Sequence, residues 1–249
     1  EQGGLDCLDK RSYRLLLVIG ELYRQQLWMY ENSKHSISDR IVSLYQPHVR
    51  PIVRGKAKAS VEFGAKVSVS LVDGFSYVEK IGWDAYNESC DLVEQIKRYK
   101  TRFGCYPESV HVDRIYRTAD NRRFCKNHGI RLSGPPLGRP SGDAELLKEQ
   151  KRQQQKDERD RIAVEGKFGQ GKRRFSLSRI MAKLANTSEV SIMMAFIVMN
   201  GQKILKEFIS FCLFACFLLD AVLHRMQTQH QLHSYSAGIR QAGPGFICW

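Results

Sequence analysis

The clearest pattern along the chain is a strict alternation of apolar and polar or small residues over 61–71. Apolar side chains occupy every second position, namely Val61, Phe63, Ala65, Val67, Val69 and Leu71. A period of two residues predicts a half-buried β-strand. Asp73 and Gly74 form a hairpin turn signal. Residues 75–83 then supply a second strand, antiparallel to the first.

Apolar residues at helical spacing predict a helix over 11–30 and another over 91–103. For the second helix, Asp91 and Glu94 resemble a capping box, and Gly104 is placed to end it. Between the first helix and the alternating strand, two prolines make 41–58 an extended, turn-rich segment.

Shorter elements follow. We expect a strand over 110–112 that ends at Asp113, a helix from Thr118 to Gly129, a strand over 130–133, a helix over 144–165, and a helix from 187 or 188 to about 200. This order predicts a mixed α/β fold. We expect the hairpin and the strand ending at Asp113 to share one sheet.

Residues 208–223 are almost wholly apolar, but Asp220 interrupts the run. A membrane-spanning helix needs about 20 apolar residues, so a helix covered by protein is the better interpretation and a membrane span is the alternative. From His224 the tail has no periodicity, and we expect it to be poorly ordered.

The net charge and its distribution along the chain indicate which class of partner the protein binds. The chain has 39 Lys and Arg against 26 Asp and Glu, a net charge of +13. Seven basic and two acidic residues lie in 111–140, and twelve basic and five acidic residues lie in 148–183. Each run alone is typical of a solvated face, but the two together favour a polyanion. Nucleic acid is the first expectation and an anionic membrane the second.

Two acids stand out. Asp113 follows a predicted strand, at the sheet edge where open α/β proteins place their sites. Glu165 is a single acid inside a dense cationic stretch. A turn cap and a surface ion pair are the plain explanations. If the two carboxylates lie together, they provide hard oxygen ligands for a magnesium site in phosphoryl transfer.

Two other kinds of site, a nucleotide-binding P-loop and a zinc site, are excluded. Residues 166–172 nearly match a phosphate-binding P-loop, but Arg173 stands where the motif needs Ser or Thr and no apolar strand precedes it. Cys125 and His128 have zinc-ligand spacing but lack a second pair.

Several long runs, in one order, resemble the bacterial insertion-sequence DDE transposases. They are residues 46–56, 62–66, 83–88, 113–117, 134–140 and 165–174, within a likeness that covers about 15–206. The resemblance implies a ribonuclease-H-like catalytic domain, a mixed sheet with flanking helices. It also implies cutting and joining of DNA ends with two divalent metal ions, Mg²⁺ or Mn²⁺.

By that resemblance, Asp113 matches the second catalytic acid and Glu165 the third. The family signature Tyr-x2-Arg-x3-Glu-x6-Lys is matched by Arg161, Glu165 and Lys172, whereas Glu158 stands at the tyrosine position.

The first acid of the family lies on the first sheet strand, upstream of the region that matches 22–54. Asp39 and Asp73 are poor substitutes, because one precedes the extended segment and the other forms the hairpin turn. Because the chain begins with Glu1, we expect it to be a fragment that lacks the first strand and is inactive alone. A degraded or frame-shifted gene copy would also explain the tail after about 206.

The resulting hypothesis is a DDE transposase fragment with an N-terminal region over 1–58, a catalytic core over 59–206 and a divergent tail over 207–249. Asp113 and Glu165 are the expected catalytic and metal-binding residues. The expected DNA contacts are Arg114, Arg117, Arg161, Lys172, Arg173 and Arg174. DNA, both element ends and target, is the expected partner, with a homo-oligomer possible and a cytoplasmic, nucleoid-associated location. The alternative is a basic nucleic-acid-binding module whose acids are structural.

Overall fold

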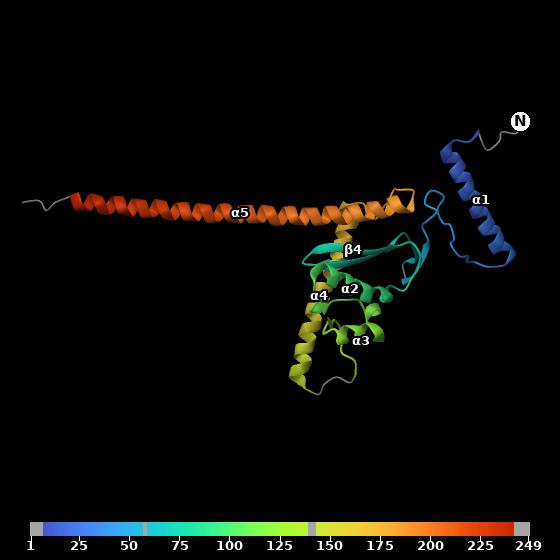
Figure 1. Cartoon of the computed structure of the whole chain (residues 1–249), viewed down its shortest axis with the longest axis horizontal. Helices are drawn as coiled ribbons and strands as arrows, with labels where there is room; N and C mark the ends of the chain where they lie inside the picture. Colours follow the sequence, from blue (N-terminus) through green and yellow to red (C-terminus); the bar gives the residue numbers. More distant parts are fainter. Residues whose placement is uncertain (1–6, 57–58, 139–142, 242–249) are drawn as a thin grey trace, which may run out of the picture. The chain divides into compact units, whose positions relative to one another are not determined.

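The computed structural model describes residues 7–56, 59–138 and 143–241 (Figure 1). The chain divides into two units, Glu1–Met199 and Asn200–Trp249. The elements in chain order are α1 (Lys10–Glu31), β1 (Pro51–Lys56), β2 (Ala59–Phe63), β3 (Lys66–Val72), β4 (Phe75–Gly82), η2 (Glu88–Asp91), α2 (Leu92–Phe103), β5 (Ser109–Val110), η3 (Arg114–Tyr116), α3 (Ala119–Asn127), β6 (Arg131–Leu132), α4 (Ala144–Arg174) and α5 (Ala185–Gln241).

The predicted hairpin is confirmed. Strands β3 and β4 pair antiparallel, with Val72 opposite Phe75 at the turn end. Asp73 and Gly74 both have positive φ, 49° and 78°, as a tight two-residue turn between twisted strands requires. The chain therefore reverses where the Asp-Gly signal predicts.

The expectation of one sheet is wrong for the described residues. They form three separate two-stranded sheets: β1 with β2, β3 with β4, and β5 parallel to β6. The alternating run breaks at Gly64, whose φ of 139° few other residues adopt, so its first part pairs with β1 instead. Strand β5 is short because the backbone N–H of Val112 donates to the side chain of Ser133, which replaces a ladder bond. The arrangement is mixed α/β, without the continuous sheet that the family resemblance implies.

One apolar core lies on the β3–β4 hairpin. Its fully buried members come from the start of α5, at Ile192, Phe196 and Met199. Val67 and Val69 of β3 pack against them, as do Phe168 and other apolar side chains from α4 and the segment that follows it. The alternation in β3 therefore positions the second half of α4.

A second core joins α2, α3 and the β5–β6 sheet around Leu92, Ile96, Cys125 and Ile130. Two of the predicted helix ends are confirmed here. Gly104 ends α2 in the left-handed conformation, and the Thr118 side chain accepts from the backbone N–H of Asn121 at the start of α3.

The cap assigned to Asp91 is a wrong prediction, because its side chain makes no capping bond. It pairs instead with Lys80 of β4 at 2.8 Å. Nearby, Glu79 of β4 is almost fully buried and takes two hydrogen bonds from Arg102 of α2, at 2.6 and 2.7 Å. Ionic contacts therefore fasten the hairpin to α2.

Both C-terminal helices run further than the sequence pattern predicts. Helix α4 continues past residue 165 to Arg174, so the P-loop-like glycines lie inside a helix. Helix α5 passes through 200 and 208–223 and reaches Gln241, where the tail was expected to lack order. Within the described ranges, no helix is both long and apolar enough to cross a membrane.

Two glycines of α4 provide a matched test of this packing. A Cβ at Gly171 would lie 2.3 Å from Cδ1 and 3.3 Å from Cγ of Leu177, whereas a Cβ at Gly166 meets nothing within 4 Å. Gly166→Ala should stabilise the protein by up to about 1 kcal/mol through helix propensity. Gly171→Ala should destabilise it by about 1–3 kcal/mol through overpacking, as measured by urea unfolding. Equal gains in both variants would show that Leu177 moves aside freely.

Candidate nucleic-acid interface

A buried carboxylate fixes the first half of α4 to the β5–β6 sheet. Asp157 is only 5% exposed, and the guanidinium of Arg131 donates to its two oxygens at 2.8 and 3.0 Å. Gln153 donates a third hydrogen bond at 2.8 Å, and Nδ1 of His111 lies 3.4 Å away. Burial by itself raises the pKa of Asp157, but the bonds from Arg131 and Gln153 outweigh it, so the pKa lies below its ordinary value.

One turn further along α4, Arg161 bridges two glutamates. Its guanidinium lies 2.6 Å from Glu158 and 2.7 Å from Glu165. Arg161 is 23% exposed, whereas the Glu158 and Glu165 side chains are 54% and 62% exposed. Residues three and four apart share one helix face, so a single arginine can hold both acids. Of the predicted site residues, the structure thus brings Arg161 and Glu165 together.

Asp113 is exposed at the end of the segment that follows β5. One of its oxygens accepts from the backbone N–H of Arg114 at 2.6 Å, so the carboxylate caps the short helix η3. The negative charge of Asp113 also affects the pKa of Glu158. The hydrogen bond from Arg161 lowers the pKa of Glu158, and the negative charge of Asp113 acts in the opposite direction.

Sequence reasoning did not include Glu158 among the site residues. The available signal was its position, because it replaces the tyrosine of the family signature with an acid. The approach of Asp113 to Glu165 stays a prediction.

A small cavity of about 130 Å³ lies between the loop after β6 and α4. Its lining comprises Arg117, Ser133, Gly134, Pro135, Gln154, Asp157, Glu158 and Arg161. Arg117 donates to the carbonyl of Val112 at 3.1 Å. Gly134 has φ 108°, and a Cβ there would lie 2.3 Å from the Arg117 guanidinium, so the close approach requires glycine.

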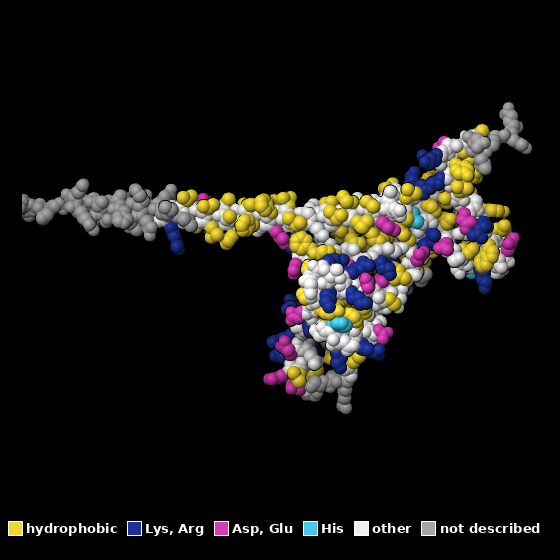
Figure 2. Space-filling model, in the orientation of Figure 1, with side chains coloured by type: hydrophobic (Ala, Val, Ile, Leu, Met, Phe, Trp, Pro, Cys, Tyr) yellow, Lys and Arg dark blue, Asp and Glu magenta, His cyan; other side chains and the backbone are white. Residues whose placement is uncertain are grey.

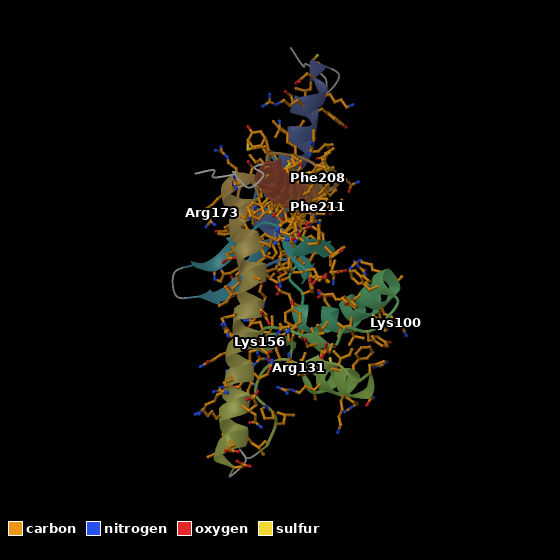
Figure 3. The ribbon with its side chains drawn as sticks, turned by 90° about the vertical axis from the view of Figure 1, so that its left-hand side faces the viewer. Lys100, Arg131, Lys156, Arg173, Phe208 and Phe211 are labelled. Atoms are coloured by element: carbon orange, nitrogen blue, oxygen red, sulfur yellow. The ribbon has the colours of Figure 1, made fainter. Side chains whose placement is uncertain are left out.

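The six predicted DNA-binding residues therefore fall into two groups. Arg117 and Arg161 are engaged inside the protein, one with a carbonyl and the other with two glutamates. Arg114, Lys172, Arg173 and Arg174 have exposed side chains. Figure 3 labels Arg173 near the end of α4 and, nearer the start of the same helix, Lys156.

The last three cations of α4 lie on its final turn. In the part of the chain that the structure describes, no ion pair is recorded for Lys172, Arg173 or Arg174. Cations at a helix C-terminus interact favourably with the helix dipole, so part of their role is structural. Lys172 follows Glu165 by seven residues, which is about 10 Å along a helix axis.

A metal centre needs several ligands close together. Among the described residues, no group of three His, Cys, Asp or Glu side chains could hold a metal ion. Asp113 is used as a cap and Glu165 as the partner of Arg161. The donor set therefore does not fit the two-metal arrangement that the resemblance implies.

Comparison with known families agrees with the resemblance over this part of the chain. Residues 110–201 match the family model described as a transposase DDE domain. The matched transposase segment contains Asp113, the cavity and the whole of α4. No curated protein and no solved structure matched the chain.

The bond between Arg131 and Asp157 makes stability depend on pH. Because the folded-state pKa of Asp157 is depressed below its ordinary value of 3.8, its stabilisation is complete above that pH and is lost as the pH falls through the folded-state pKa. Asp157→Asn should cost about 1–3 kcal/mol at pH 7, and the difference from wild type should narrow below pH 3.8.

Urea unfolding at several pH values measures this difference. The control is Glu149→Gln on the same helix, because Glu149 is exposed and lies 4.0 Å from Arg152. That variant should be near neutral at every pH. A cost for Asp157→Asn that stays constant down to pH 2.5 would show that the charge of Asp157 does not provide the stabilisation.

Proposed function

We propose that this chain acts as a transposase-family protein that binds DNA through the end of α4 and does not cut DNA strands by itself. The observation that carries the proposal is the set of three exposed cations, Lys172, Arg173 and Arg174, within the transposase segment. Their charges are available to phosphates, because no acid of the described chain pairs with them.

The binding would be electrostatic and tolerant of sequence. Each cation that neutralises a DNA phosphate releases condensed counterions, and this release drives association at low salt. Exposed Arg114, beside Asp113, offers a further phosphate contact. Arg161 and Arg117 would be less available to phosphate, because Arg161 pairs with two glutamates of its own helix and Arg117 donates to the carbonyl of Val112.

Asp113 and Glu165 are the acids that the family resemblance assigns to metal binding and catalysis. In transposition, such acids hold divalent ions while DNA strands are cut and joined. Here the described residues supply no third ligand beside them. We therefore propose that metal-dependent chemistry with Mg²⁺ or Mn²⁺ needs a carboxylate from outside the described residues.

The second candidate is a basic DNA-binding module whose acids are structural. The cap formed by Asp113 and the ion pair formed by Glu165 favour it, since both contacts already use these carboxylates. The two candidates predict the same DNA binding by the chain alone. They differ in whether a carboxylate supplied from outside the described residues would give metal-dependent chemistry.

The DNA surface is tested by charge removal at one end of α4. Lys172→Ala, Arg173→Ala and Arg174→Ala together should weaken binding to a random duplex and make the slope of log K against log salt shallower by roughly 2–3. A triple variant of Lys148, Lys151 and Lys156 is the control, because it removes equal charge elsewhere on α4. Filter binding at several salt concentrations measures both. Equal losses in the two variants would show that net charge, not this surface, determines binding.

The catalytic question is tested with a labelled duplex. The chain alone should bind it in EDTA, without any need for a divalent ion, and should leave both strands intact on a denaturing gel in Mg²⁺ or Mn²⁺. Asp120→Asn is the control for Asp113→Asn and Glu165→Gln, because Asp120 is exposed and pairs only loosely with Arg123, at 3.8 Å. Metal-dependent nicking that survives Asp120→Asn but disappears in the other two variants would establish an active enzyme and overturn the proposal.

A further inference from the structure

A cavity of about 710 Å³ lies between α1 and the segment that follows it, outside the matched transposase segment. Sites that bind small organic molecules have volumes of about 300–1,000 Å³. Figure 2 shows acidic, basic and hydrophobic side chains close together on the surface around α1. We call this cavity the α1 pocket. Six residues of its lining matter most for its chemistry, namely Glu21, Arg24, Trp28, Ser36, Ser38 and Asp39.

The wall of the α1 pocket is fixed by a buried glutamine. Gln25 is only 2% exposed. Its Nε2 donates to the backbone carbonyl of Asp39 at 3.3 Å, and its Oε1 accepts from the backbone N–H of Ile41 at 2.9 Å. Asp39 has φ 53°, a left-handed conformation that aspartate adopts more readily than most residues. Both ends of one side-chain amide therefore hold the segment to α1, and the pocket is formed without a ligand.

The charges of the pocket lining are unequal. Arg24 donates two hydrogen bonds to the carboxylate of Glu21, at 2.6 and 2.7 Å, so these two charges neutralise each other. The Asp39 side chain is 78% exposed, and its ion pair with Arg50 is loose, at 3.9 Å. The lining thus carries two carboxylates and one guanidinium, in a chain whose net charge is +13. Asp39 supplies the acidic excess.

Trp28 adds an aromatic wall to the pocket and is 40% exposed. The face of an indole ring attracts ammonium and guanidinium groups, because the ring quadrupole places negative charge there. Ser36 and Ser38 bring hydroxyl groups, which accept hydrogen bonds as well as donate them. The pocket therefore combines an aromatic surface, a carboxylate and further acceptors.

We propose that the α1 pocket binds an organic cation, a guanidinium or ammonium group, between the indole ring of Trp28 and the carboxylate of Asp39. Such cations have only hydrogen-bond donors, which the carboxylate and the hydroxyl groups of the lining accept. Guanidinium fits best, because its planar group stacks on an aromatic ring while it donates to a carboxylate. An anion such as DNA phosphate would be repelled by Asp39, so this site is separate from the cations at the end of α4.

The first experiment compares two probes of nearly the same shape. N-acetylarginine amide carries a guanidinium group, and N-acetylcitrulline amide carries an uncharged urea group in its place. In NMR spectra of the full chain, the arginine probe should shift the indole N–H signal of Trp28 saturably, and the citrulline probe should bind at least about tenfold more weakly. Equal binding of the two probes, or no saturable shift with either, would overturn the proposal.

Single variants locate the site. Asp39→Asn and Trp28→Leu should each weaken binding of the arginine probe by about fivefold, because one removes the ion pair and the other the aromatic face. Glu31→Gln is the matched control and should leave the affinity unchanged, because Glu31 is exposed on α1 and lies outside the lining. The backbone amide signals of Ser36 and Ser38 report binding in every variant. A loss in Glu31→Gln as large as that in Asp39→Asn would show that overall charge attracts the probe, and the proposal would be wrong.

The last experiment separates two sources of the cation. Agmatine is a free molecule with a guanidinium group and a second amine, whereas a short glycine peptide with one central arginine presents the guanidinium as a protein side chain. Stronger competition by agmatine against the arginine probe would identify a small-molecule ligand, and stronger competition by the peptide would identify an arginine of a protein partner. Competition by neither would contradict the proposal.

Discussion

The hydrogen-bonded ion pair between Arg131 and Asp157 determines where the transposase segment places its functional groups. A two-residue strand such as β6 provides few backbone bonds, so side chains must fix α4 against it. The bidentate geometry fixes both the depth and the rotation of the helix, which a single bond cannot do. The positions of Glu158, Arg161 and Glu165 follow from this one anchor.

The two halves of α4 contact the rest of the protein with different kinds of side chain. Its first half meets the β5–β6 sheet with polar groups. Its second half adds Phe168 to the apolar core on the β3–β4 hairpin, and Gly171 lies close to Leu177 and Met199. The cations of the last turn are therefore held by an apolar core, although they themselves lie in solvent. This division separates the groups that maintain the fold from those available to DNA.

Local rules account for what the sequence predicts well. The Asp73–Gly74 turn, the Thr118 cap and the Gly104 helix end each depend on a few neighbouring residues. The single sheet was a wrong prediction because pairing between distant strands depends on breaks such as Gly64 and on substitutes such as the Ser133 hydroxyl. The predicted helix over 144–165 is shorter than α4, because glycine has a low helix propensity and three glycines, at 166, 169 and 171, follow directly.

For the candidate site too, the sequence predicts the residues better than it predicts their partners. Asp113, Arg161 and Glu165 could be selected from spacing and resemblance, but spacing does not say which groups neutralise them. Asp91 illustrates the difficulty on a smaller scale, since its sequence context favours a cap and its structure provides a partner for Lys80. A carboxylate takes the nearest cation that the fold supplies, and that cation is often remote in sequence.

The sharing of Arg161 between Glu158 and Glu165 has a thermodynamic consequence. A phosphate that draws the guanidinium away releases both carboxylates at once, and a cation that binds the carboxylates releases the guanidinium. Each ligand therefore lowers the free-energy cost of binding the other, and by linkage the two effects are equal in size. An arginine shared by two acids would therefore couple the binding of an anion to the binding of a cation at this position.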